Sequence, residues 1–121
     1  MKITATAVTH TGRRSNNEDH YLVADALHLY AVADGMGGYA GGEVASRLTV
    51  EQLEAFIARN RRDAAGTWPC KEDKRLSYAE NLLRAAVVHA HDTIAAQRVG
   101  DLDQMGSTVV AVLIEGPKAT L

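Results

Sequence analysis

At the centre of the chain stands Val32-Ala33-Asp34-Gly35-Met36-Gly37-Gly38-Tyr39-Ala40-Gly41-Gly42-Glu43-Val44-Ala45-Ser46, in which an apolar strand leads into an aspartate, then into glycines, then into a helix. These fifteen residues contain five of the ten glycines. Glycine has no side chain and tolerates positive φ, so a glycine cluster after a strand lets the backbone turn sharply or approach a ligand closely. Asp34 stands where this turn begins, which indicates a cationic ligand.

Length and composition indicate one globular domain. The 121 residues are 46% hydrophobic and 23% charged, and both shares are ordinary for a globular protein. The net charge of -2 leaves no basic footprint, which argues against nucleic acid as the main partner. The single cysteine, Cys70, has no partner for an internal disulfide and indicates a reducing compartment. Because no apolar run approaches membrane-spanning length, we expect a soluble, cytoplasmic protein with no membrane partner.

The spacing of apolar residues predicts strands toward both ends of the chain and two helices between them. In chain order, the expected elements are a strand over 2–9, a polar loop over 10–17, a hairpin of 21–24 with 27–33, a helix from 42 to about 60, a surface connection over 61–75, a helix over 76–99, a loop over 100–106, a strand over 107–115, a turn at 116–117 and a strand from 118. The run at 107–115 is almost continuously apolar, as is typical of a strand covered on both faces. This order favours an α+β fold over alternating βαβ units. Since the final strand stops at Leu121, we expect one partial domain, 1–121, that ends before its fold is complete.

Acidic residues flank the predicted hairpin and suggest a divalent-cation site. Asp34 offers carboxylate oxygens and Gly35 offers a backbone carbonyl, and hard cations such as Mg2+ and Mn2+ prefer oxygen ligands. Strand pairing could bring Glu18 and Asp19 beside Asp34, where three carboxylates at one sheet edge would repel one another without a cation. Arg14, in the preceding loop, is close enough in sequence to share the site, and its guanidinium suits phosphate oxygens.

Each of these residues also has a simpler interpretation. An aspartate before a glycine is common in turns, and an acidic pair or a loop arginine is common on any solvated surface. The segment 35–40 fits the dinucleotide fingerprint G-x-G-x-x-A, but Asp34 would set a negative charge beside the pyrophosphate and no βαβ unit follows. The segment 101–106 begins like a calcium-binding EF-hand loop, yet Val112 stands where the bidentate glutamate is needed. The sequence therefore disfavours both of these ligands.

Together, three motifs resemble the metal-dependent protein phosphatase family, the PPM or type 2C serine/threonine phosphatases. In family order they are Gly12-x-Arg14-x-x-Asn17-Glu18-Asp19, Val32-Ala33-Asp34-Gly35-Met36-Gly37-Gly38 with Gly42-Glu43-x-Ala45-Ser46, and Met105-Gly106-Ser107-Thr108. Their order and spacing make the resemblance specific, and it spans essentially the whole chain. The Asp-Gly-Met-Gly-Gly form is similar to bacterial members, with Met36 where many eukaryotic members carry a histidine thought to protonate the leaving group.

The resemblance implies an αββα sandwich with a two-metal centre of Mn2+ or Mg2+ at one edge of the sheets, of which this chain would be the N-terminal part. Asp34 then resembles the aspartate that bridges both metals, and Gly35 resembles the backbone-carbonyl ligand. Glu18 and Asp19 resemble the acidic pair that binds metal, partly through coordinated water. Arg14 resembles the arginine that grips phosphate. Family members continue with further metal-binding aspartates beyond the last residue of this chain.

The activity implied by the resemblance is hydrolysis of phosphoserine and phosphothreonine in proteins by water activated between two metal ions. The partners would be substrates of serine/threonine kinases, and the complete form would be a monomer. Because the later aspartates lie outside these 121 residues, we expect this chain alone to be inactive. The alternative hypothesis is a non-catalytic regulatory or binding module that retains the phosphatase fold.

Overall fold

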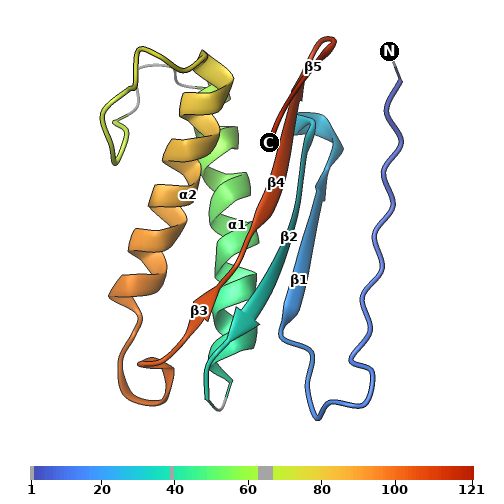
Figure 1. Ribbon diagram of the computed structural model, residues 1–121, viewed down its shortest axis with the longest axis vertical. Helices are drawn as coiled ribbons and strands as arrows, with labels where there is room; N and C mark the ends of the chain where they lie inside the picture. The colour runs from blue at the N-terminus through green and yellow to red at the C-terminus, as the bar shows by residue number, and fades with distance from the viewer. Residues whose placement is uncertain (1, 39, 63–66) are drawn as a thin grey trace.

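The computed structural model describes residues 2–38, 40–62 and 67–121. In these residues, two helices that run in opposite directions cover one face of an antiparallel sheet (Figure 1). The elements in chain order are β1 (Asp19–Ala24), the 3-10 turn η1 (Asp25–Leu27), β2 (Leu29–Met36), α1 (Gly41–Arg62), α2 (Tyr78–Ala96), the 3-10 turn η2 (Gly100–Leu102), β3 (Gly106–Ser107), β4 (Val110–Glu115) and β5 (Lys118–Thr120). The strands lie in the order β1-β2-β4-β5, and β3 also pairs with β2. The α+β fold predicted from the order of elements is confirmed.

The predicted hairpin is confirmed, with a longer turn than expected. β1 and β2 pair antiparallel along the whole of β1. Residues 25–27 form a 3-10 turn, and His28 closes it in the left-handed region at φ 53, where its N–H donates to the Asp25 carbonyl at 3.1 Å. Leu27, predicted as the first residue of the second strand, therefore belongs to the turn.

Both predicted helices are present. α1 extends slightly beyond the expected range at each end, whereas α2 is shorter than the predicted 76–99. A capping box sets the start of α2: the Ser77 hydroxyl accepts from the Glu80 N–H at 3.1 Å, and the Glu80 carboxylate accepts from the Ser77 N–H at 2.6 Å. Neither helix in the described ranges is long and apolar enough to cross a membrane.

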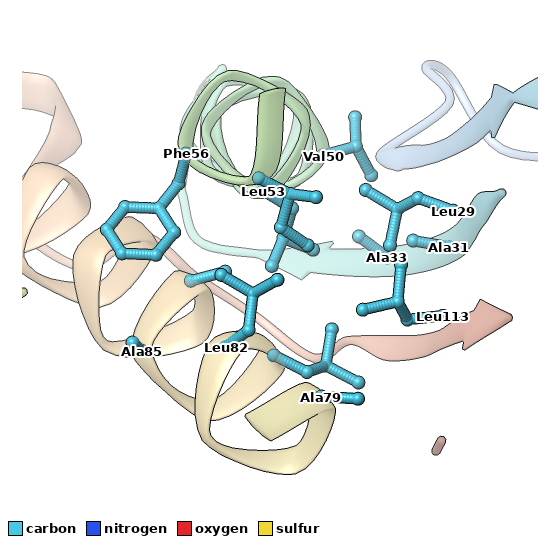
Figure 2. Close-up of a cluster of buried hydrophobic side chains, with 13 residues drawn as sticks. Leu29, Ala31, Ala33, Val50, Leu53, Phe56, Ala79, Leu82, Ala85 and Leu113 are labelled. Carbon is cyan, nitrogen blue, oxygen red and sulfur yellow. The ribbon is translucent and has the colours of Figure 1, made fainter. Parts of the chain in front are cut away.

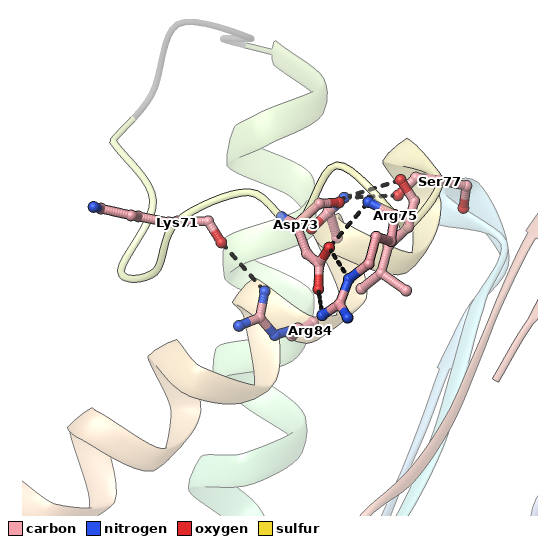
Figure 3. A network of polar contacts seen from close by, with 7 residues as sticks. Lys71, Asp73, Arg75, Ser77 and Arg84 are labelled. Carbon is pink, nitrogen blue, oxygen red and sulfur yellow. Dashed lines mark hydrogen bonds and ion pairs between the residues drawn. The ribbon is translucent and has the colours of Figure 1, made fainter.

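Residues 67–77, which precede α2, form no helix or strand and are attached to α2 by polar contacts (Figure 3). The side chain of Asn81, 2% exposed, donates to the Asp73 carbonyl at 2.9 Å and accepts from the Asp73 N–H at 2.8 Å. Arg75 forms an ion pair with the Asp73 carboxylate at 2.7 Å. Residues 63–66 of the predicted surface connection lie outside the described residues.

The core lies between the helix pair and the inner face of the sheet (Figure 2). Along β2, the side chains of Leu29, Ala31 and Ala33 are buried while those between them are more exposed. Phe56 of α1 and Leu82 of α2 are both 1% exposed and pack into the same cluster. Full burial of one large apolar side chain contributes about 1.5–3 kcal/mol. This burial determines which face of the sheet meets the helices.

The opposite face, here called the outer face, carries the exposed side chains of Tyr21, Val23, Val32 and Val110. The prediction that the strand at 107–115 is covered on both faces is wrong for the described residues, because Val110 is 60% exposed. The same run is also divided into β3 and β4. A continuous apolar run does not reveal how many of its faces are covered, since the covering layers come from other parts of the fold.

The strand predicted over 2–9 is also not observed, because this segment is extended but pairs with no strand in the described part of the chain. Its alternation is nevertheless present, since Ile3, Ala5 and Ala7 are partly buried and the residues between them are exposed. Ala5 and Ala7 border a pocket on the outer face together with Tyr21. Alternation predicts the placement of side chains, whereas a strand also requires a neighbour for its backbone hydrogen bonds.

Candidate functional site

Two carboxylates face each other across β1 and β2 near the end of the hairpin. Asp19 and Asp34 are direct partners in the strand register. The N–H of Gly35 donates to the Glu18 carbonyl at 3.0 Å, so the backbone hydrogen bond between the strands joins the residues next to the two aspartates. Asp19 and Asp34 therefore form a non-hydrogen-bonded pair. In such a pair the Cβ atoms are about 4.5–5.5 Å apart and the side chains share a face. Strand pairing therefore brings Asp19 beside Asp34, as expected.

Glu18 takes a different position from Asp19. A Cβ on Gly42 would clash with the Cδ and Oε2 atoms of Glu18, so the Glu18 carboxylate packs against the first turn of α1. The partial positive charge at a helix N-terminus favours a carboxylate there. The expected group of three carboxylates does not form: within residues 2–38, 40–62 and 67–121, no set of three or more acidic, histidine or cysteine side chains could hold a metal ion.

Gly35 and Gly42 allow three segments to meet without side chains between them. A Cβ on Gly35 would overlap the Gly42 carbonyl oxygen and lie 2.9 Å from the Glu18 carbonyl oxygen. Only glycine permits this approach of β2 to the start of α1. The close approach observed here is between backbone segments, whereas the glycine cluster predicted a sharp turn or a close approach to a ligand.

Arg14 lies in the predicted loop, on its exposed side. Its N–H donates to the Thr11 carbonyl at 3.4 Å, across a turn in which Gly12 has φ 67. Among the described residues, no ion pair joins its guanidinium to Asp19 or Asp34. The structure therefore does not place Arg14 against the aspartate pair.

Asn17 connects this loop to β1. Its Oδ1 accepts from the Asp19 N–H at 3.0 Å, and its Nδ2 donates to Thr9 Oγ1 at 2.6 Å. Thr9 thereby borders a pocket of about 280 Å3 that Asp19, Asp34 and Thr108 also line. Val8, Val32 and Val110 form the apolar part of this pocket, so the oxygen ligands that a hard cation prefers come from Asp19 and Asp34.

The contacts that hold Asp34 in place were not predicted from the sequence. The N–H of Thr108 donates to the Asp34 carbonyl at 2.8 Å, and Thr108 Oγ1 accepts from the Asp34 N–H at 3.2 Å. Ser107 Oγ lies 3.3 Å from the same Asp34 carbonyl. The motif Met105-Gly106-Ser107-Thr108 marks this segment in the sequence. The motif alone does not show that Thr108, 74 residues after Asp34, lies beside it.

His20 joins β1 to α1 next to the aspartate pair. Its Nδ1 lies 2.8 Å from Ser46 Oγ, and Ser46 is fully buried. Ser46 Oγ in turn donates to the Glu43 carbonyl at 3.3 Å. This chain of contacts anchors the strand that carries Asp19 to the helix layer, so His20 has a structural role.

Comparison with known proteins supports one family. The family model described as Protein phosphatase 2C matches residues 7–121. Over 110 residues, the chain is 37% identical to the serine/threonine protein phosphatase PstP of Mycobacterium tuberculosis, in a match that covers 89% of this chain and 18% of PstP.

Solved structures of related proteins agree with this match. The crystal structure of Mycobacterium tuberculosis PstP/Ppp aligns with a TM-score of 0.66 at 35% identity, covering 88% of this chain and 39% of that one. The catalytic domain of PstP in complex with two manganese ions aligns with a TM-score of 0.62 at 36% identity, covering 85% and 39%. MsPP from Mycobacterium smegmatis in complex with cacodylate aligns with a TM-score of 0.61 at 29% identity, covering 86% and 36%.

The chain spans less than half the length of each of these relatives. The similarity nevertheless extends over nearly all of the chain and includes all three motifs. On this evidence, the chain belongs to the protein phosphatase 2C family.

Proposed function

We propose that the protein containing this chain hydrolyses phosphoserine and phosphothreonine esters in proteins, with Asp19 and Asp34 among its ligands for Mn2+ or Mg2+. The observation that carries this proposal is the direct opposition of the two aspartates in a chain of the protein phosphatase 2C family. The similarity to PstP, a serine/threonine protein phosphatase, supports the class of substrate.

The charge of the aspartate pair supports a cation at this position. Like charges directly opposite each other on one sheet face destabilise a strand pair. Among the described residues, no lysine or arginine forms an ion pair with Asp19 or Asp34. Mg2+ is commonly held by one or two carboxylates together with water and substrate phosphate. The two carboxylates therefore fit a divalent ion of this kind.

Each residue of the proposed site has a separate task. Asp19 and Asp34 would hold the ions, and Gly35 would add its backbone carbonyl. Glu18 would act from the side of α1, through water. Arg14 would bind phosphoryl oxygens after its exposed side chain turns toward the pocket, because a planar guanidinium matches two such oxygens. The ions, when bound, would lower the pKa of water and neutralise charge on the phosphoryl group.

Met36 cannot supply the proton that the leaving group needs. It lies at the end of β2 and is 65% exposed. A thioether has no proton to give, so water or another group must protonate the departing serine or threonine oxygen.

The test is phosphate release from phosphoserine and phosphothreonine peptides by the natural-length protein. We expect release that depends on Mn2+ or Mg2+, stops on chelation, and is lost in Asp34→Asn. Asp25→Asn is the matched control, because Asp25 accepts from the Tyr30 hydroxyl at 2.9 Å at the other end of the hairpin. Release that survives both chelation and Asp34→Asn would overturn the proposal.

For the 121 residues taken alone, a specific observation favours the alternative of a non-catalytic module. The described residues bring two carboxylates together, and no set of three or more potential ligands forms among them. We therefore infer that this chain by itself is inactive. Mn2+-dependent turnover by this 121-residue chain would contradict this inference.

A further inference from the structure

Thr108 lies opposite Asp34 in a place where the strand ladder is irregular. β3 and β4 pair with β2 in one continuous register, so Thr108 is the cross-strand neighbour of Asp34. However, β3 ends at Ser107 and β4 begins at Val110, which leaves Thr108 in the interruption between them.

The irregularity arises because the Thr108 hydroxyl replaces the Thr108 carbonyl as a hydrogen-bond acceptor. The Thr108 N–H donates to the Asp34 carbonyl at 2.8 Å, as in a regular ladder. The return bond is different, since the Asp34 N–H donates to Thr108 Oγ1, at 3.2 Å, in place of the Thr108 carbonyl. That carbonyl accepts from Ser107 Oγ at 2.8 Å. Thr108 therefore contacts both backbone polar groups of Asp34, and Ser107 Oγ also lies 3.3 Å from the Asp34 carbonyl oxygen.

The hydroxyl of Thr108 can satisfy two bonds at once. Its Oγ1 also lies 3.3 Å from the Asp34 carbonyl oxygen. A hydroxyl has one proton and two lone pairs, so Oγ1 can donate to this carbonyl while it accepts from the Asp34 N–H. Thr108 is exposed and belongs to neither buried cluster, so its hydroxyl acts on Asp34 and not on the core.

We propose that Thr108 is a positioning residue for Asp34. Its hydroxyl holds the backbone of Asp34 just before the glycine-rich turn, where glycine leaves the chain the most conformational freedom. Holding this backbone aims the carboxylate into the pocket that Asp19, Asp34 and Thr108 line together. The inference rests on the proposed function, because it takes Asp34 to be a metal ligand.

The experiment measures Mn2+ affinity and phosphate release for the natural-length protein and three variants. Thr108→Val keeps the shape but removes the hydroxyl, and Thr108→Ser keeps the hydroxyl. Thr93→Val is the control, because Thr93 Oγ1 donates to the His89 carbonyl at 3.1 Å within α2, away from the site. We expect Thr108→Val to weaken Mn2+ binding about tenfold, the size of one lost net hydrogen bond, and to lower kcat more than it raises KM.

Thr108→Ser and Thr93→Val should keep the wild-type Mn2+ affinity. Thr108→Val with unchanged affinity and kcat, beside an active wild type, would overturn the positioning role and leave the proposed function standing. A wild type that neither binds Mn2+ nor releases phosphate would overturn the proposed function and this role with it. If Thr108→Val does not fold, Thr108→Ser decides, and a tenfold loss of affinity in that variant would refute a role for the hydroxyl.

Discussion

Replacing Gly35 by alanine should destabilise the fold at the junction of β2, Glu18 and α1. The new Cβ would overlap the Gly42 carbonyl oxygen, lie 2.6 Å from the Gly42 carbonyl carbon and lie 2.9 Å from the Glu18 carbonyl oxygen. All three are backbone atoms, so no side chain can rotate away to make room. Overpacking of this kind costs about 1–3 kcal/mol, and a rigid backbone neighbour places Gly35→Ala at the upper end of that range.

Urea unfolding of the natural-length protein measures this cost. With a slope of about 2 kcal/mol per molar, a loss of about 2–3 kcal/mol lowers the urea midpoint by about 1–1.5 M. Gly38→Ala is the matched control, because a Cβ on Gly38 would meet nothing within 4 Å. Equal midpoints for the two variants would refute the packing argument. The clash should also displace the Glu18 and Gly42 backbones, so Gly35→Ala should weaken Mn2+ binding in the same preparation.

Three further predictions concern pH, helix capping and charge. Burial lowers the pKa of His89, and the charge of Arg59 contributes, so the unfolded chain binds a proton more readily than the folded chain. The free energy of unfolding should therefore decrease as the pH falls below the ordinary histidine pKa of about 6.5. In urea unfolding, His89→Gln should lose less stability than wild type on acidification, and equal losses would contradict this. Ser77→Ala removes the capping box with Glu80 and should cost about 0.5–2 kcal/mol in the same assay, whereas an unchanged midpoint would show that the cap contributes nothing. Asp19→Asn removes the repulsion between the two carboxylates and should stabilise the metal-free protein by about 0.2–1 kcal/mol, while added Mn2+ should stabilise the variant less than wild type. Melting curves in which Mn2+ raises the melting temperature of the variant more than that of wild type would count against a cation at this pair.

Much of the fold could be predicted because its elements depend on local patterns. The helical spacing around Leu53 and Phe56 identifies a buried face without knowledge of the rest of the chain. In the strand that follows the hairpin turn, Val32 is as apolar as its buried neighbours, so the sequence predicts the strand but not its buried face. The turn at His28 could not be predicted in the same way, because a histidine with positive φ has no distinctive sequence signal. Coverage of the strands was also mispredicted, since a sequence pattern shows that a side chain avoids water but not what covers it.

The candidate site, like the fold, was only partly predictable from local sequence patterns. The sequence by itself determined the residue types: a carboxylate before glycines, an acidic pair before a hairpin, and a later motif ending in Thr108. Strand register was needed to show that Asp19, and not Glu18, shares a face with Asp34, because neighbouring residues on a strand point to opposite sides. Only the tertiary structure could bring the Thr108 hydroxyl onto the backbone of Asp34, since a contact across 74 residues depends on how the whole sheet and helix layer pack.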